Sequence, residues 1–197
     1  RSTPLYSRQR QMCIRDSLST LRQRGVEIIG PEAGHLASGM RGVGRMVEPT
    51  ELLGRIRRAA GRGGPLAGRK LIVTAGGTQE PIDPVRVIAN RSSGKQGFAL
   101  AQAALDLGAQ VILVTGPVSL PAPAGARRID VDTAEQMLAA VMVELPGTDA
   151  LLMAAAVADF RPADSAAQKI KKEGGLPEIR LEATPDILAQ VAGMKSE

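Results

Sequence analysis

Aromatic residues are nearly absent from this 197-residue chain, which has no tryptophan, one tyrosine and two phenylalanines. Proteins that hold single-stranded nucleic acids commonly stack the bases on aromatic side chains, so this kind of site is disfavoured. The single cysteine excludes an internal disulfide framework and is typical of a reducing, cytoplasmic setting. No apolar run reaches the roughly 18 residues of a membrane-spanning helix. We therefore expect a cytoplasmic protein that binds small molecules and has neither a nucleic acid nor a membrane as its partner.

Positive charge is concentrated at the amino terminus. The formal net charge is +5, but residues 1–17 hold four arginines against one aspartate, which leaves +2 for the rest of the chain. So small an excess is weak support for a polyanionic partner. Residues 1–17 also lack the apolar segment of a signal peptide. They are interpreted as a non-native sequence at a truncated end or, alternatively, as a disordered leader, and Cys13 within them is a poor candidate for chemistry.

Residues 18–60 form a short module with its own pattern. A helix is expected to end at Gly25, followed by a strand at 26–30, a glycine-rich loop at 31–49 and a second helix capped by Thr50. About forty residues are too few to bury an independent core. The module is therefore predicted to be the tail of a domain that begins upstream.

Residues 61–68 contain four glycines and one proline, and they are predicted to be a linker. Beyond them, strands and helices alternate. Strands are expected at 70–77, 110–117, 127–133, 149–160 and 177–183, and helices within 92–109, 133–145 and 184–194. Thr133 and Thr184 are predicted to cap the last two helices, with Pro185 in the first helical position. This alternation predicts an α/β, Rossmann-like three-layer fold with a mostly parallel sheet and ligands at the carboxyl ends of the strands.

The loop that follows the strand at 70–77 concentrates groups that bind phosphate. The candidates are Gly76, Gly77, Thr78, Ser92, Ser93 and Gly94. The acidic residues of the loop, Glu80 and Asp83, and the amide of Asn90 are candidates for holding a metal-bound phosphate or for orienting an acyl group. The alternative is a structural loop whose glycines and prolines only shape turns.

Neither common nucleotide fingerprint is present in this loop. The G-x-G-x-x-G pattern fails because Gly76 and Gly77 are adjacent and no third glycine opens a helix at the required spacing. The Walker A pattern fails because Ala89 stands at its first glycine and Gln96 replaces its Ser or Thr. The loop therefore has nucleotide-like chemistry without a standard motif.

Residues 74–101, TAGGTQEPIDPVRVIANRSSGKQGFALA, closely resemble the opening motif of phosphopantothenate–cysteine ligase. The resemblance covers nearly all of residues 69–197, because further motifs follow in the same order: VTGPVSLPAP, AAAVADFRP, QKIKK and TPDILA. Several separate motifs at proper spacing make it specific. This ligase is usually the carboxyl-terminal half of a bifunctional coenzyme A biosynthesis protein, behind phosphopantothenoylcysteine decarboxylase.

The resemblance implies a two-step ligation. The carboxylate of 4′-phosphopantothenate attacks the α-phosphate of CTP, with Mg²⁺ assisting, to give an acyl-cytidylate and pyrophosphate. The amine of cysteine then displaces CMP and forms the amide. Such a reaction depends on positioning and on cations and amides placed at the phosphate.

The resemblance also implies roles for single residues. Lys169 matches a lysine that stabilises charge in the first step, and Asn90 matches an asparagine that handles the acyl-cytidylate. Asp159 matches an acid that contacts the nucleotide or the metal. The matched nucleotide-binding positions are Met153, Ala154, Ala155, Thr184, Pro185, Asp186 and Ile187. Without the resemblance, Lys169, Lys171 and Lys172 would be interpreted as a solvated run of charge.

Residues 18–49 resemble the end of the decarboxylase, including its glycine-rich GxGRM segment. Ser38 stands where many relatives have a proton-donating cysteine, and a hydroxyl is far less acidic than a thiol, so serine is poorly suited to that role. His35 is interpreted as a loop residue and not as a base. The resemblance implies FMN in the full decarboxylase domain and homo-oligomers of the full protein. We expect residues 18–60 to be a decarboxylase remnant and residues 69–197 a ligase domain truncated at its carboxyl end, with little or no activity in this chain alone.

Two other classes of protein remain alternatives. An NAD(P)-binding oxidoreductase is disfavoured for two reasons. The glycine fingerprint is absent, and the strand at 110–117 ends in Thr115 and Gly116, where such a protein is expected to have an acidic residue that binds the ribose. A binding module without activity would bind nucleotide even after Lys169 and Asn90 are replaced.

Overall fold

The computed structural model of this chain describes residues 16–171 and 178–194. The chain separates into two compact units that divide between Leu53 and Gly54. Residues 1–15 of the predicted leader, and Lys172, lie outside the described residues. Within the described ranges, no helix combines the length and the apolar composition that crossing a membrane requires. The domain boundaries predicted from the sequence stay predictions.

The first unit contains a short helix and a hairpin. Residues 16–23 are helical, and Gly25 follows with a φ of 80°, as predicted for a helix that ends in a left-handed glycine. The strand predicted at 26–30 is wrong: these residues belong to no strand, and an extended segment without a partner gains no ladder hydrogen bonds.

The predicted glycine-rich loop is instead a hairpin of β1 (Glu32–His35) and β2 (Arg41–Arg45). Its glycines allow close approach within the hairpin: Cβ atoms at Gly42 and Gly44 would lie 3.4 and 3.0 Å from methyl carbons of Leu36. Helix α2 (Pro49–Gly61) follows. Thr50 is not its N-cap, because the helix already begins at Pro49, whose fixed φ suits the first helical position.

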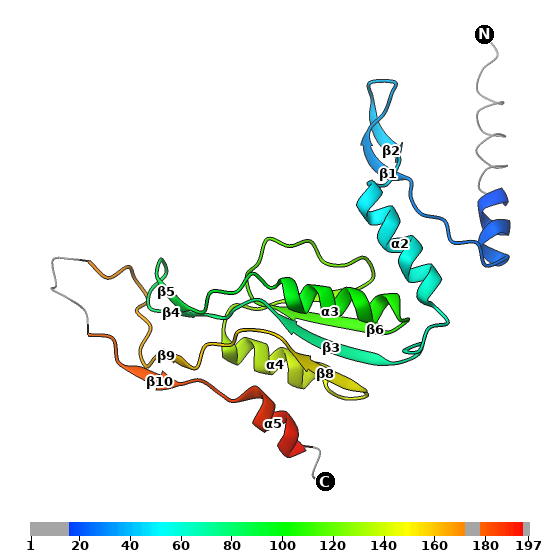
Figure 1. The fold of residues 1–197 in the computed structure, drawn as a ribbon. Coiled ribbons are helices and arrows are strands. Elements are labelled where there is room, and N and C mark those ends of the chain that lie inside the picture. Colours follow the sequence, from blue (N-terminus) through cyan, green and yellow to red (C-terminus); the bar gives the residue numbers. More distant parts are fainter. Residues whose placement is uncertain (1–15, 172–177, 195–197) are drawn as a thin grey trace. The chain divides into compact units, whose positions relative to one another are not determined.

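Four parallel strands form the central sheet of the second unit, in the order β7-β6-β3-β8. Figure 1 labels three of them, β6, β3 and β8. The four strands are β3 (Lys70–Ala75), β6 (Gln110–Thr115), β7 (Arg127–Asp130) and β8 (Ala150–Met153). Beyond α2, the described part of this unit contains the helices α3 (Lys95–Asp106), α4 (Ala134–Glu144) and α5 (Ile187–Met194). The predicted α/β fold with a parallel sheet is confirmed.

Both faces of the sheet carry an apolar core. Leu71, Val73 and Ala75 of β3 pack with α3 on one face, whereas Ile72 faces the other side with the buried residues of α4 and α5. This division follows from the alternation of side chains along a strand. The helices on the two sides of the sheet are visible in Figure 1. Phe98 is the only aromatic residue among the described core residues, so aliphatic side chains supply the rest.

Two small antiparallel ribbons extend beyond the central sheet. They pair β4 (Gln79–Pro81) with β5 (Val87–Ala89), and β9 (Phe160–Pro162) with β10 (Leu181–Ala183). The strand predicted at 177–183 therefore exists only in part, and it joins a ribbon and not the parallel sheet. The strand predicted at 149–160 ends at Met153, because the amides that follow it bond to Thr74 and to the loop after β3.

Of the two helix caps predicted in the second unit, the one at Thr133 is confirmed and the one at Thr184 is wrong. Thr133 caps α4 and exchanges hydrogen bonds with Gln136 in a capping box. Thr184 does not cap α5: its hydroxyl donates to the carbonyl of Ala158, and the carboxylate of Asp186 accepts the amide of Ala189 at 2.9 Å instead. Asp186 directly precedes the helix, so it occupies the N-cap position.

The segment at 61–68, predicted to be a linker, forms successive turns. The amide of Leu66 donates to the carbonyl of Leu107 at 2.9 Å, just beyond the end of α3. A Cβ atom on Gly61 would lie 2.4 Å from the carbonyl oxygen of Asp106, so only glycine fits there. The end of α2 is thereby packed against the end of α3.

Candidate functional site

The strand order reverses between β3 and β8, and open α/β sheets place their ligands at such a point, beyond the carboxyl ends of the strands. The hydroxyl of Thr74 accepts hydrogen bonds from the amides of Ala154 and Ala155 at 3.1 and 3.2 Å. Ala154 and Ala155 were predicted to be nucleotide-binding positions, and the structure directs the amides of both into the protein. Their contribution to a site is therefore to fix the path of the chain after Met153.

The two loops that leave β3 and β8 are joined by backbone hydrogen bonds. The amide of Ala156 donates to the carbonyl of Gly76 at 2.7 Å, and the amide of Thr78 donates to the carbonyl of Ala156 at 3.3 Å. The side chain of Thr78 is fully buried, and its hydroxyl accepts the amide of Ala158 at 2.9 Å. Thr78 therefore has a structural role in this arrangement.

The adjacent glycines Gly76 and Gly77 allow close approach of a neighbouring loop. A Cβ atom on Gly77 would lie 2.9 Å from the carbonyl oxygen of Asn90, and one on Gly76 would lie 3.1 Å from the carbonyl oxygen of Gly116. Gly76 also has a φ of 74°, which favours glycine. The pair matters first for packing, which agrees with the structural alternative for this part of the loop.

The start of α3 is the part of the loop best suited to an anion. Gly94 occupies the N-cap position with a φ of 72°, and no side chain caps the first amides of the helix. The hydroxyl of Ser92 accepts the amide of Gly94 at 3.3 Å, and Ser93 is exposed beside it. Uncapped amides at a helix start, together with the helix dipole, favour a phosphate.

Asn90 lies against the loop that follows β8. Its side-chain amide donates to the carbonyl of Val157 at 3.0 Å, and its side chain is exposed. Val157 also lines a cavity of about 260 Å³ beyond the carboxyl end of β8. The residues that line this cavity are Met153, Val157, Ala158, Asp159, Thr184, Pro185, Asp186, Ile187 and Leu188.

This cavity brings together most of the nucleotide positions predicted after β8. Met153 ends β8 and Asp159 lies in the segment that follows it, whereas Thr184 to Ile187 lead into the first residue of α5. The amide of Thr184 donates to the carbonyl of Asp159 at 3.0 Å and so links the two segments that line the cavity. Lys169 does not line the cavity, and neither do the residues of the start of α3.

The carboxylate of Asp159 is exposed and suits a cation that also contacts a ligand. No group of three or more His, Cys, Asp or Glu side chains that is able to hold a metal occurs among the described residues. Mg²⁺ in nucleotide sites is commonly held by one or two carboxylates together with substrate phosphates, and Asp159 fits that pattern.

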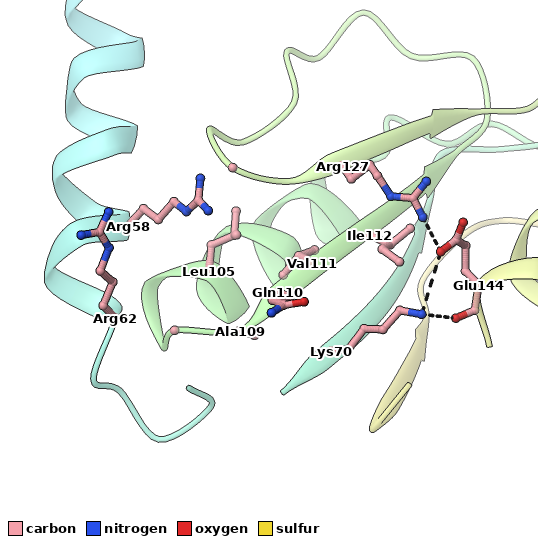
Figure 2. Close-up of a pocket in the computed structure, with 12 residues that line it drawn as sticks. Arg58, Arg62, Lys70, Leu105, Ala109, Gln110, Val111, Ile112, Arg127 and Glu144 are labelled. Atoms are coloured by element: carbon pink, nitrogen blue, oxygen red, sulfur yellow. Dashed lines mark hydrogen bonds and ion pairs between the residues drawn. The ribbon is translucent and has the colours of Figure 1, made fainter. Parts of the chain in front are cut away.

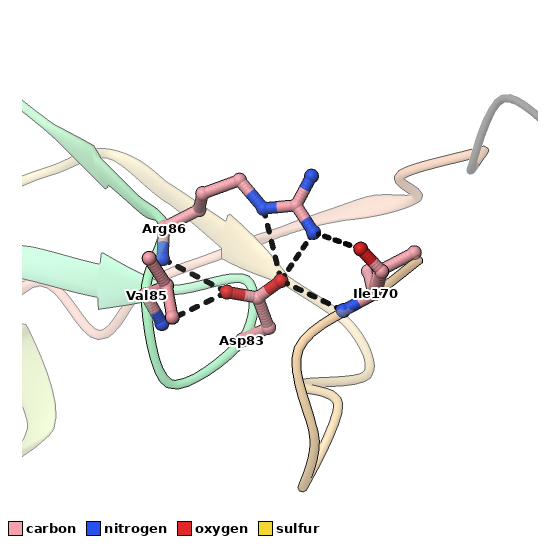
Figure 3. Close-up of polar contacts among 4 residues, drawn as sticks. All are labelled: Asp83, Val85, Arg86 and Ile170. Atoms are coloured by element: carbon pink, nitrogen blue, oxygen red, sulfur yellow. Dashed lines mark hydrogen bonds and ion pairs between the residues drawn. The ribbon is translucent and has the colours of Figure 1, made fainter. Parts of the chain in front are cut away.

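Glu80 and Asp83 are not free to act as ligands for a metal-bound phosphate, contrary to the prediction. Both are about 2% exposed. Glu80 accepts the amide of Ala134 at the start of α4 at 2.8 Å. Asp83 bonds within its own turn and to Ile170, a residue next to Lys169 (Figure 3). The prediction missed this link because the partners lie far apart in the sequence.

Asp83 is held ionised by its neighbours. The guanidinium of Arg86 keeps the pKa of the Asp83 carboxyl well below its usual value; burial opposes this effect, and the amides of Val85, Ile170 and Arg86 add to it. The carbonyl of Ile170 in turn accepts a hydrogen bond from Arg86 at 2.9 Å. The turn and the lysine segment thus form one connected structure.

A larger cavity, of about 500 Å³, lies at the opposite, amino edge of the sheet (Figure 2). The ammonium of Lys70 donates to the carbonyl of Glu144 at 2.6 Å, and Arg127 forms an ion pair with the carboxylate of Glu144. These contacts neutralise the carboxyl end of α4. None of the predicted site residues lines this cavity, so the candidate site remains at the carboxyl edge.

The first unit places Ser38 in the turn between β1 and β2, where it is exposed. His35 ends β1 and is also exposed, so it is a strand residue and not the loop residue predicted.

Residues 66–197 match the family described as DNA/pantothenate metabolism flavoprotein C-terminal domain. The coenzyme A biosynthesis bifunctional protein CoaBC of Vibrio vulnificus (strain YJ016) is 48% identical over 187 residues. The match covers 94% of this chain and 46% of that protein, so the chain spans about half the length of the curated relatives it matches.

Solved structures show the same fold. The C-terminal domain of a coenzyme A biosynthesis bifunctional protein CoaBC superposes with a TM-score of 0.59 and 42% identity, over 66% of this chain and 61% of that chain. A Cab2 mutant in complex with phosphopantothenate-cysteine superposes with a TM-score of 0.55, over 73% of this chain and 64% of that chain. At 18% identity, the second likeness bears on the fold alone.

Proposed function

Because the chain belongs to the family of the DNA/pantothenate metabolism flavoprotein C-terminal domain, we propose that it serves the CTP-dependent ligation of 4′-phosphopantothenate to cysteine. The reaction proceeds through an acyl-cytidylate and belongs to coenzyme A biosynthesis. The working protein is a cytoplasmic homo-oligomer in which a decarboxylase domain precedes the ligase.

One observation carries the proposal. The cavity beyond β8 gathers Met153, Asp159 and the residues from Thr184 to Ile187, all of which the ligase resemblance assigns to the nucleotide or, for Asp159, to the nucleotide or its metal. Asn90 is bonded to Val157 at the wall of the same cavity. Residues that lie far apart in the sequence thus meet at the place where this kind of sheet binds ligands.

In the first step, a carboxylate oxygen of 4′-phosphopantothenate attacks the α-phosphorus of CTP, and the bond to pyrophosphate breaks. Negative charge develops on the phosphate oxygens. Lys169 is the proposed source of a neutralising ammonium, and the uncapped amides at the start of α3 are the proposed site for a phosphate of one substrate. Bound Mg²⁺ would offset further phosphate charge, with the carboxylate of Asp159 as its protein ligand.

In the second step, the amine of cysteine attacks the acyl carbon, CMP leaves with the bonding electrons, and the amine loses a proton. Asn90 is the proposed orienting group for the acyl-cytidylate. Its side chain is held by the carbonyl of Val157, so its amide oxygen remains to be directed toward the ligand. A fixed amide favours this role, because a reacting acyl group must be held in one geometry.

The decarboxylase assignment concerns the first unit. Ser38 at the hairpin turn is the residue proposed to face the decarboxylase product, with a hydroxyl in place of the usual thiol. FMN would supply the redox chemistry of that domain.

The ligase proposal is tested by measuring pyrophosphate release and amide formation separately, with CTP, 4′-phosphopantothenate and cysteine. The assay uses this chain and a version extended at its carboxyl end with the remaining sequence of the Vibrio vulnificus relative. We expect activity in the extended protein, and little or none in the chain alone. Titration of ATP in place of CTP measures the nucleotide preference.

Two substitutions separate the steps. Lys169→Ala should slow pyrophosphate release by roughly 10²-fold, because a charge that stabilises the transition state is lost. Lys171→Ala removes a lysine that is also exposed, two residues away, and is the matched control. Asn90→Ala should leave pyrophosphate release in place and slow amide formation, so that the acyl-cytidylate accumulates.

Two other outcomes would favour the alternatives. Binding of CTP without any turnover in the extended protein would favour a binding module, and hydride transfer to NAD(P) would favour an oxidoreductase.

A further inference from the structure

The turn between β4 and β5 holds the lysine segment in place through one buried carboxylate. We infer that Asp83 is a positioning residue for Lys169: it fixes the peptide unit of Ile170, and thereby the point from which the lysine side chain extends. The inference rests on the proposed function, since it concerns the lysine assigned to the first step.

The carboxylate of Asp83 uses its two oxygens for two different tasks. Oδ1 accepts the amides of Val85 and Arg86, both at 2.9 Å, and so shapes the turn. Oδ2 accepts hydrogen bonds from the Arg86 guanidinium and from the amide of Ile170, the latter at 3.1 Å. The side chain of Asp83 has no exposed surface, so water does not replace these contacts.

Both backbone groups of Ile170 are engaged by this turn (Figure 3). Its amide donates to Asp83, and its carbonyl accepts from Arg86 at 2.9 Å. A second attachment lies four residues earlier, where the amide of Ala166 donates to the carbonyl of Ile82 at 2.9 Å. The chain between Ala166 and Ile170 is therefore fixed at both ends to one turn.

Lys169 lies within this fixed stretch, although the stretch has no helix or strand of its own. Its side chain is exposed and free to extend into solvent or toward a ligand. A lysine has a long flexible stem, so its ammonium is placed well only if its backbone is fixed. A shift of about 1 Å in a positioned group can lower a rate by about 10²-fold.

A second buried acid on the ribbon of β4 and β5 provides a matched control. Glu80, on β4, is as deeply buried as Asp83 and also accepts a backbone amide, but that amide belongs to Ala134 at the start of α4. A change at Glu80 should therefore disturb α4 and leave Ile170 in place. The two acids thus separate a general loss of stability from a loss of position.

The experiment compares Asp83→Asn with Glu80→Gln in the extended protein. Asparagine can keep its oxygen toward the turn while its NH₂ group faces the amide of Ile170, which no longer has an acceptor. Amide hydrogen exchange should become at least about 10-fold faster at Ile170 in Asp83→Asn and remain unchanged at Ala134. Glu80→Gln should show the opposite pattern. If Asp83→Asn does not fold, Ile170→Pro removes the same donor and leaves the carboxylate intact; residue 170 then has no amide hydrogen, so this variant is used in the kinetic test alone.

The kinetic test uses the first step alone. In Asp83→Asn the kcat for pyrophosphate release should fall by roughly 10- to 100-fold, with the KM for CTP within about twofold of wild type. In a Lys169→Ala background the same substitution should cost less than about twofold, because a residue that acts through Lys169 has nothing left to position. Glu80→Gln should reduce kcat equally in both backgrounds.

Three results would overturn the inference. The first is unchanged exchange at Ile170 in folded Asp83→Asn, which would remove the contact itself. The second is faster exchange at Ile170 with unchanged pyrophosphate release, and the third is a loss of rate as large without Lys169 as with it. If the wild-type protein releases no pyrophosphate, the proposed function fails and the inference falls with it, whereas the exchange data still decide whether Asp83 holds Ile170.

Discussion

The hydroxyl of Thr78 accepts a hydrogen bond from the backbone amide of Ala158 at 2.9 Å. Thr78 has no exposed surface and Ala158 is 4% exposed, so the bond is shielded from water. It joins the segment after β3 to the segment after β8, and Ala158 lies between two residues that line the candidate cavity, Val157 and Asp159. The wall of the cavity therefore depends on a threonine that does not itself line it.

Thr78→Val should lower the free energy of unfolding by about 1–3 kcal/mol, because the valine keeps the volume and leaves the amide of Ala158 without an acceptor. Urea unfolding measures this loss. Thr148→Val is the control, since the hydroxyl of Thr148 donates to the carbonyl of Glu144 at the other edge of the sheet, where solvent has access. Equal, small losses in the two variants would contradict a special role for Thr78.

Gly97→Ala should destabilise the second unit. A Cβ atom at Gly97 would lie 2.5 Å from the Cβ of Ala75 and 2.7 Å from the carbonyl oxygen of Thr74, so α3 has to move away from β3. Overpacking of this kind costs about 1–3 kcal/mol. Gly193→Ala in α5 meets no atom within 4 Å and should raise stability by up to about 1 kcal/mol through helix propensity. Thermal unfolding compares the two, and a stabilised Gly97→Ala would show that the helix is not packed so closely.

The sequence was sufficient to predict the central sheet and its covering helices. The apolar runs at β3 and β6 and the capping pattern at Thr133 are local signals, and each is found where predicted. Parallel strands with helices on both faces follow from the alternation of these signals. The fold class therefore needed no information about contacts between distant residues.

The candidate site was harder to predict, because its contacts are distant in sequence. Glu80 and Asp83 resemble ligands when they are considered beside a glycine-rich loop. Their partners, Ala134 and Ile170, lie 54 and 87 residues away, so no local pattern identifies either acid as structural. The error at Thr184 has a similar origin, since its hydroxyl bonds to Ala158, 26 residues earlier, and leaves the cap to Asp186.

Lys70→Met should destabilise the protein without affecting ligation in the folded state. The ammonium of Lys70 donates to the carbonyls of Glu144 and Pro146 at 2.6 and 3.0 Å, at the carboxyl end of α4 (Figure 2). Loss of these bonds and of the favourable charge at the helix end should cost about 1–2 kcal/mol. Lys171→Met, at an exposed lysine, is the control for stability. A large loss of kcat in folded Lys70→Met would show that the cavity at the amino edge takes part in the reaction.

Asp83 should make the stability of the protein sensitive to acid. Its pKa is lowered in the folded state, chiefly by the Arg86 guanidinium. An unfolded chain has an aspartate pKa of about 3.9, so the unfolded state binds this proton more readily than the folded state as the pH falls. The stabilisation from ionised Asp83 is therefore fully present above about pH 5 and is lost as the pH falls toward the folded pKa.

The measurement is the difference in unfolding free energy between wild type and Asp83→Asn, by urea unfolding at several pH values from 7 to 3. The difference should be constant above about pH 5 and shrink below about pH 4. The wild-type curve alone does not isolate this effect, because hydrogen bonds from the amide of Lys70 and the side chain of Arg69 lower the pKa of Asp149 as well. Asp149→Asn is therefore the control, and its own difference should also shrink on acidification. A difference in unfolding free energy between wild type and Asp83→Asn that stays constant down to pH 3 would mean that the fold does not stabilise the ionised form of Asp83. The hydrogen bond that attaches Ile170 to the turn would then not depend on a charged carboxylate.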